Sequence, residues 1–209
     1  MPAIAPDRRE LLLDAAQALF AERPFDAVSI ADITQRAGVA FGLVAHYFGS
    51  KRGVYVASMQ AMADQLRAVR DRPPEQDDMA IALQVGIRRH IAYLEEHAVG
   101  FRVLMRGGIG ADEEVRQIVM RLRWEGAERV MMALNVNHPI GPELYTAMYG
   151  WVGFLNESML AWLEQKAFPR EQFATMIITM LVATLRTVMV MNPHTGIDPR
   201  LLDRLEGKS

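Results

Sequence analysis

Apolar residues recur every three or four positions along most of the chain, and Gly and Pro mark the breaks between these stretches. This spacing predicts amphipathic helices, and the alternation typical of strands is almost absent. The expected helices cover residues 7–21, 29–37, 40–48, 51–70, 79–97, 99–106, 112–134, 142–165 and 170–191, with a frayed helix at 198–209. The pattern predicts an all-α fold of about nine or ten helices, with a three-helix head followed by a larger antiparallel helical body.

The second and third helices of the head are spaced like a helix-turn-helix. Ser29 opens the second helix, and Asp32 lies three residues further on, as in a capping box. Gly38 provides the left-handed residue at which the chain reverses. We therefore expect a helix-turn-helix DNA-binding domain at residues 1–50 and a ligand-binding and dimerisation domain at 51–209. The alternative is an ordinary three-helix cap that does not bind DNA.

Charge is distributed unevenly, although the net charge of the chain is only −2. No Asp or Glu occurs between Ile33 and Ala63, whereas Arg36, Lys51 and Arg52 all fall there. A surface free of acids suits contact with phosphates. The chain has no cysteine, which excludes disulfides, thiolate metal sites and thiol catalysis. Such a composition fits a reducing compartment, and we expect a cytoplasmic protein.

The run LLDAAQALFAERPFDAVSIADITQRAGVAFGLVAHYFGSKRGVY, which starts at Leu12, resembles the N-terminal domain of TetR-family transcriptional regulators. The shared features are the AA-x-x-LF helix, the F-x-x-x-S-I-x-x-I core, the A-G-V turn, the G-x-x-x-x-Y-F recognition helix and the following S-K. The resemblance implies a homodimer that binds a double-stranded DNA operator and carries a helical ligand-binding body. The residues expected at DNA are Ser29, Arg36, Ala40, Phe41, Gly42, Leu43, His46, Tyr47 and Lys51.

Three positions differ from the usual pattern of this family. Ala40, Phe41 and Ala45 stand where Ser or Thr, Lys or Arg, and Tyr are common. Two usual phosphate contacts are therefore missing, which keeps open a second reading: a helical small-molecule carrier that has lost DNA binding. We expect His46 to face base edges. Phe41 either contacts a thymine methyl group or packs against the preceding helix.

The body is rich in residues that can line a cavity between helices. The chain contains 14 methionines, whose flexible side chains fill irregular apolar space. The candidate ligand-binding residues are Phe101, Met105, Met120, Trp124, Trp151, Phe154 and Asn156. A methionine-rich core without a cavity is the alternative, and Asn156 either binds a polar group of a ligand or forms a hydrogen bond across a dimer. We expect a mainly apolar effector that releases a repressor from a pseudo-palindromic operator.

The sequence contains no recognisable catalytic motif. His90 and His97 lie seven residues apart, but no third ligand follows at metal-binding spacing. The GGIG segment at 107–110 follows a helix rather than a strand, so we expect a linker and not a phosphate-binding loop. We therefore expect no enzymatic activity, no metal and no cofactor.

The most apolar stretch is FATMIITMLVATLRTVMVM at 173–191, about as long as a membrane span. Arg186 interrupts it, and four threonines dilute it. A helix that is apolar on all sides lies either in lipid or against protein on several sides. We expect the second case, with no membrane and with a homodimer through helices near 142–165 and 170–191 that places Leu181 in the contact. A membrane-associated helical protein is the alternative.

Overall fold

The computed structural model describes residues 7–73, 75–107, 112–136 and 139–207. These ranges contain ten α-helices, one short 3-10 helix and no strand, which confirms the all-α prediction. The expected loops at 71–78, 107–110 and 135–142 include residues 74, 108–110 and 137–138, which lie outside the described ranges. The chain divides into two compact units: Met1–Leu66 with Ala98–Met120, and Arg67–His97 with Arg121–Ser209.

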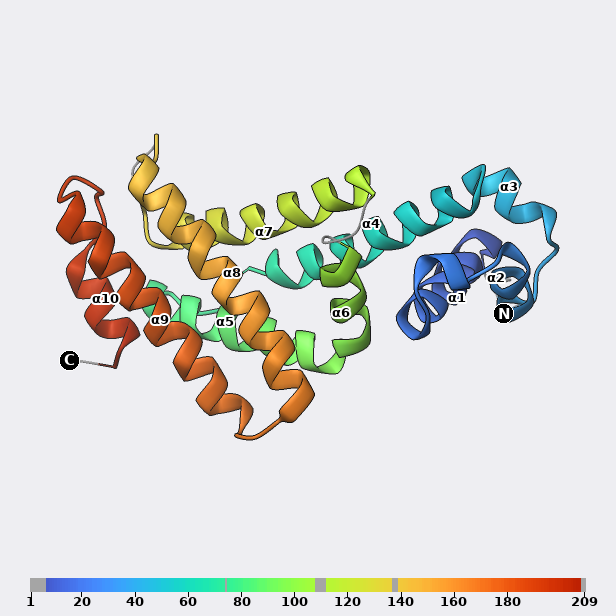
Figure 1. Cartoon of the computed structure of the whole chain (residues 1–209). Helices are drawn as coiled ribbons and strands as arrows, with labels where there is room; N and C mark the ends of the chain where they lie inside the picture. Colours follow the sequence, from blue (N-terminus) through green and yellow to red (C-terminus); the bar gives the residue numbers. More distant parts are fainter. Residues whose placement is uncertain (1–6, 74, 108–111, 137–138, 208–209) are drawn as a thin grey trace. The chain divides into compact units, whose positions relative to one another are not determined.

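The first unit holds the predicted helix-turn-helix. Its elements are α1 (Arg8–Glu22), η1 (Phe25–Ala27), α2 (Ile30–Ala37), α3 (Gly42–Phe48), most of α4 (Lys51–Arg70), α6 (Ala98–Gly107) and the beginning of α7 (Glu113–Ala133) (Figure 1). Helix α1 packs against α2 and α6. The core includes Leu12, Ile33, Val44 and Val54, which are fully buried. Burial of one apolar stripe per helix accounts for the period seen in the sequence.

Local sequence explains where the helices of this unit begin and end. The Ser29 hydroxyl accepts a hydrogen bond from the Asp32 amide at 3.1 Å, and the Asp32 carboxylate accepts one from the Ser29 amide at 2.9 Å. This reciprocal pair confirms the predicted capping box. Gly38 ends α2 with φ of 65°, and Gly49 ends α3 with φ of 74°, backbone angles that favour glycine. Helix α3 begins at Gly42, two residues later than the sequence pattern suggests.

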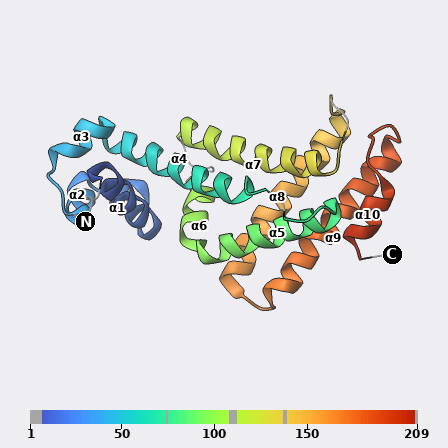
Figure 2. The same cartoon turned by 180° about the vertical axis from the view of Figure 1, so that it is seen from behind.

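The second unit is built around long helices. It holds the last residues of α4, most of α7, and α5 (Met79–Glu96), α8 (Pro142–Gln165), α9 (Arg170–Met191) and α10 (Pro199–Leu205) (Figure 2). Helices α8 and α9 pack side by side, and α9 also contacts α5 and α10. The turn between α8 and α9 contains Lys166 in the left-handed region, with φ of 44°. Trp162 and Phe173 stack near this turn with their ring centroids 5.1 Å apart.

Helix α9 is covered by its own chain more fully than the sequence suggests. It buries Phe173, Ala174, Ile177, Ile178, Leu181, Val182, Leu185 and Val188. Leu181 is fully buried, so the prediction that it lies in a dimer contact is wrong: α8, α5 and α10 already cover that face. Arg186 has partners as well, because it forms ion pairs with Asp203 of α10 at 2.7 Å and with Glu206, the C-cap of that helix, at 3.1 Å.

Among the described residues, α9 alone is long and apolar enough to cross a membrane by length and composition. Of its most apolar window, 44% is buried inside the structure. Core helices of soluble proteins pass the same test, so this finding is weak evidence for a membrane span.

Candidate functional site

Helix α3 presents an exposed surface to its surroundings. Its side chains are exposed at Ala45, His46 and Tyr47, and so is Phe41 at its N-cap, where 63% of the residue's surface is accessible. The exposure of Phe41 disfavours packing against the preceding helix. Ala40 and Gly42 are exposed as well, and Leu43 is half-buried, whereas Val44 anchors α3 in the core. A short helix with one buried anchor and several exposed side chains can enter a major groove.

The polar residues expected at DNA already have partners inside the first unit. The Lys51 ammonium donates a hydrogen bond to the Phe25 carbonyl at 3.0 Å and lies 4.2 Å from the centroid of the Phe25 ring. Arg36 forms an ion pair with Glu22 at 2.9 Å. The Ser29 hydroxyl caps α2. Each of these groups keeps further donors, since an ammonium carries three and a guanidinium five.

Arg52 has acidic partners that the sequence pattern does not reveal. Its guanidinium bonds to the Asp112 carboxylate at 2.7 and 3.0 Å and to Glu114 at 3.0 Å. The hydrogen bonds from Arg52 lower the pKa of the Asp112 carboxyl group below its ordinary value. The cation of Arg52 is therefore partly neutralised, although the surrounding sequence contains no acid.

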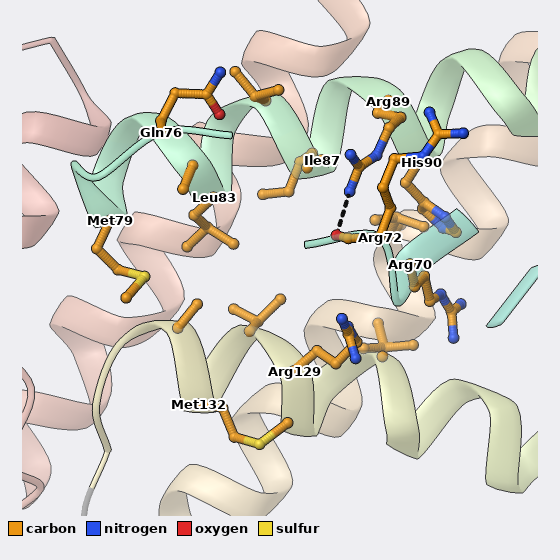
Figure 3. A pocket seen from close by; sticks show the side chains of 18 of the residues that line it. Arg70, Arg72, Gln76, Met79, Leu83, Ile87, Arg89, His90, Arg129 and Met132 are labelled. Carbon is orange, nitrogen blue, oxygen red and sulfur yellow. Dashed lines mark hydrogen bonds between the residues drawn. The ribbon is translucent and has the colours of Figure 1, made fainter. Parts of the chain in front are cut away.

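A cavity of about 400 Å³ lies inside the second unit (Figure 3). Its walls come from the end of α4 and the segment after it, one face of α5, the C-terminal part of α7, and α8. Met79, Leu83 and Ile87 of α5 line it at helical spacing, and Met132 of α7 lies at the same end as Met79. The volume is within the usual range for small-molecule sites, about 300–1,000 Å³.

The other end of the cavity is cationic. Arg70, Arg72, Arg89 and Arg129 line it together with His90. Burial is the main reason that the pKa of Arg70 falls to about 10, and its Nη1 donates a hydrogen bond to the Leu122 carbonyl at 2.7 Å.

His90 at this end is neutral. Burial lowers its pKa well below the ordinary value of 6.5, and the neighbouring Arg70 lowers it further. The residue is partly exposed where it lines the cavity, whereas its Nδ1 is buried and has no hydrogen-bond partner in the described part of the chain.

Two of the seven predicted ligand-binding residues line this cavity, Trp151 and Asn156. The Trp151 indole donates a hydrogen bond to the Ile177 carbonyl at 3.2 Å, so the ring also ties α8 to α9. Asn156 is 5% exposed, and its side-chain amide forms no hydrogen bond with a described residue. Phe154 is on α8 but does not line the cavity. Trp124 lines a separate hollow of about 20 Å³.

The remaining three candidates belong to the first unit. Phe101 and Met105 are buried in its core, and Met120 is 39% exposed. None of these three residues is among those that line the cavity of the second unit. Sequence reasoning missed the arginines of the cationic end, because residues 70–72 fall at a helix end and in a loop. The spacing of Met79, Leu83, Gly86 and His90 on one face of α5 was the available signal.

No group of three or more potential metal ligands occurs within the described ranges. The molecule thus combines two features: a helix-turn-helix with an exposed second helix, and a separate helical unit with a ligand-sized cavity. Together they define a helix-turn-helix DNA-binding protein with a second helical unit that holds a cavity.

Comparison with known proteins agrees with this class. The profile of "Bacterial regulatory proteins, tetR family" matches residues 12–58, and that of "Tetracyclin repressor-like, C-terminal domain" matches residues 79–184. The chain therefore belongs to the TetR family of transcriptional regulators.

Individual relatives support the assignment over different parts of the chain. The HTH-type transcriptional regulator BetI of Cronobacter sakazakii is 39% identical over 71 residues, which are 32% of this chain and 35% of the relative. The chain thus matches about a third of the length of these curated relatives.

Solved structures match over most of the chain. A tetR-family transcriptional regulator from Streptomyces coelicolor has a TM-score of 0.80 and 26% identity, and the match covers 99% of this chain and 91% of the other. FadR from Bacillus subtilis, solved in complex with stearoyl-CoA, has a TM-score of 0.66 and 16% identity, with 84% and 98% covered. The second likeness is one of fold alone.

Proposed function

We propose that this protein is a cytoplasmic, ligand-responsive repressor that binds a pseudo-palindromic DNA operator as a homodimer. A mainly apolar small molecule bound in the cavity would release it from DNA. We assign DNA binding to residues 1–50, and ligand binding with dimerisation to 51–209. The single observation that carries the proposal is the exposed face of α3, since Phe41, His46 and Tyr47 have no role in the core that explains them.

Two kinds of DNA contact are expected from this face. The Tyr47 hydroxyl suits a phosphate contact. Gly42 has no side chain, and the space that a Cβ would occupy is open, so a DNA phosphate can approach the protein backbone closely there. Such contacts set register but carry no sequence information. His46 and Phe41 are the residues assigned to base edges, His46 by hydrogen bonding and Phe41 by contact with a thymine methyl group.

The dimer is assigned to the outer faces of α8 and α9. A shallow hollow of about 560 Å³ runs between them and is lined by Ala147, Thr184, Thr187 and Met191, among other residues. Val190 is 83% exposed beside it. A pair of apolar helix faces left uncovered by the chain suits an isologous contact between two copies.

Ligand control is assigned to the cavity of the second unit. Helices α4 and α7 each carry residues of both units, so the cavity wall and the helix-turn-helix unit share continuous helices. A ligand that prefers one arrangement of these helices would shift the population away from the form that binds DNA. FadR, which shares the fold, was solved with stearoyl-CoA, and this supports a ligand with an apolar portion.

The carrier without DNA binding remains the second candidate. The observation that favours it is the engagement of Lys51 by Phe25, together with Ala40, Phe41 and Ala45 at positions where polar or charged residues would bind phosphate.

Selection of genomic DNA fragments with the purified protein at low salt separates the two functions. If the protein is a repressor, the wild type should reproducibly enrich a motif with two related half-sites, and a variant with Ala at both His46 and Tyr47 should not. If it is a carrier, no motif should be enriched. Selection with Gln117→Ala, an exposed change on α7, is the control and should return the wild-type motif.

A further inference from the structure

We propose that the cavity binds an amphipathic anion, a carboxylate on an apolar body, with the acidic group held by Arg72, Arg89 and His90. This inference names the class of effector, and it rests on the proposed function only in treating the cavity as the effector site.

The cationic end is a cluster that brings together separate segments of the chain. The Arg89 guanidinium donates a hydrogen bond to the Arg72 carbonyl at 3.1 Å, which holds the segment after α4 against α5 (Figure 3). His90 follows Arg89 on α5 and is close enough to Arg70 for that cation to lower its pKa. With Arg129 of α7, four guanidinium groups and one imidazole therefore gather at one end of a single cavity.

Three of the four arginines at this end form no ion pair within the described residues, although the charges of Glu125 and Asp71 partly offset the fall in the pKa of Arg70. Arg129 has one, since it pairs with Asp71 at 2.6 Å. Arg70, Arg72 and Arg89 form no ion pair with a described carboxylate. Glu75 is the one acid among the described lining residues, and it is exposed and pairs with none of them.

Two polar atoms of this cluster are unsatisfied, and because they are buried, a ligand in the cavity reaches them only when their side chains turn toward it. The Nε of Arg89 and the Nδ1 of His90 are buried and have no hydrogen-bond partner in the described ranges. Leaving such groups unpaired costs free energy, and a buried polar group normally has a partner. A carboxylate supplies two acceptor oxygens, which can receive hydrogen bonds from a guanidinium and from a neutral imidazole N–H. An alcohol or an amine cannot neutralise the same charges.

The opposite end of the cavity is apolar and suits an apolar group of the ligand. Met79 and Leu83 of α5 face Met132 of α7 across the cavity. Ten residues separate Met79 from Arg89 on one helix, which corresponds to about 15 Å at helical rise. A medium-length hydrocarbon chain or an elongated aromatic acid spans this distance. A cavity of about 400 Å³ at the lower end of the small-molecule range leaves little room for a large polar group such as a nucleotide.

Calorimetric titration of the full-length protein with ligands of equal chain length tests the inference. The probes are decanoate, 1-decanol, decylamine and decanoyl-coenzyme A. Decanoate is expected to bind at least about tenfold more tightly than the alcohol or the amine, the ratio that about 1.4 kcal/mol produces.

Two variants then test where the acid group lies. Arg72→Gln and Arg89→Gln should each weaken decanoate binding by about tenfold and leave 1-decanol binding unchanged, because each removes one charged donor. Arg72 is exposed, so its variant should fold even if the change at the half-buried Arg89 does not permit folding. Arg200→Gln on α10 is the matched control, since Arg200 is exposed and does not line the cavity.

Four results would overturn the inference: equal binding of decanoate and 1-decanol, binding of decanoate that neither variant weakens, tighter binding of decanoyl-coenzyme A than of decanoate, or no binding of any probe. These measurements contain no DNA. Decanoate binding without any effect on an operator would therefore leave the inference intact and contradict only the proposed regulation.

Discussion

His90 lies in an environment that favours its neutral form. Its pKa is lowered by burial first and by Arg70 second. The unfolded chain takes up a proton on this imidazole near pH 6.5, whereas the folded chain does not. Stability is therefore complete above that pH and falls below it, by up to about 1.4 kcal/mol per pH unit.

His90→Gln removes this titration. Urea unfolding at about pH 7.5 and about pH 5.5 should show that acidification reduces the free energy of unfolding less in the variant than in the wild type. His194→Gln, on an exposed residue, is the control and should follow the wild type. Parallel profiles for the wild type and His90→Gln would contradict the burial of a neutral imidazole.

Tyr47 and His46 are neighbours on α3 with different expected roles. Tyr47→Phe removes one hydroxyl and should weaken binding to all duplexes alike, because phosphate contacts position the protein without reading sequence. His46→Ala should instead change which duplex is preferred. Fluorescence anisotropy with a panel of half-site variants measures both effects. Lys51→Ala is a poorer test, since Lys51 also holds Phe25 inside the first unit. A uniform loss in His46→Ala would remove its assignment to base edges.

At the scale of elements, helix boundaries were readable because caps and breakers are local. The Ser29 and Asp32 capping box, Gly38 and the Pro142 start of α8 all depend on residues within a few positions of each other. Which parts of the chain pack over α9 could not be predicted from the sequence. Arg186 looked like an interruption of an apolar helix, and its partners, Asp203 on α10 and Glu206 at the C-cap of α10, are 17 and 20 residues away. The cationic end of the cavity was missed for the same reason.

The capping box itself gives a prediction at this scale. Ser29→Ala leaves the Asp32 amide at the start of α2 without its acceptor and should lower stability by about 1 kcal/mol. Ser29→Thr keeps a hydroxyl at the N-cap and should lose less. Thermal or urea unfolding measures the difference. Equal stability of Ser29→Ala and the wild type would show that water replaces the cap at no cost.

At the scale of the whole molecule, the dimer proposal depends on faces that one chain leaves uncovered. Thr187 is exposed and lines the hollow between α8 and α9, so Thr187→Glu should place a charge in the contact and shift sedimentation toward monomer without unfolding. Leu181→Glu would act differently, because Leu181 is buried in its own chain and the charge would unfold it. Gln35→Glu adds the same charge at an exposed residue of α2 and should leave the dimer intact. A wild-type protein that sediments as a folded monomer would contradict the assigned interface.

The proposed function requires that DNA binding and ligand binding are coupled in one molecule. The most direct measurement is the affinity of the wild type for its selected duplex by anisotropy, at fixed salt, with and without saturating decanoate. Ligand should weaken DNA binding by roughly 5–150-fold, which corresponds to about 1–3 kcal/mol of coupling, and DNA should weaken ligand binding by the same factor. Tight DNA binding that stays the same when calorimetry shows the cavity to be filled would contradict it.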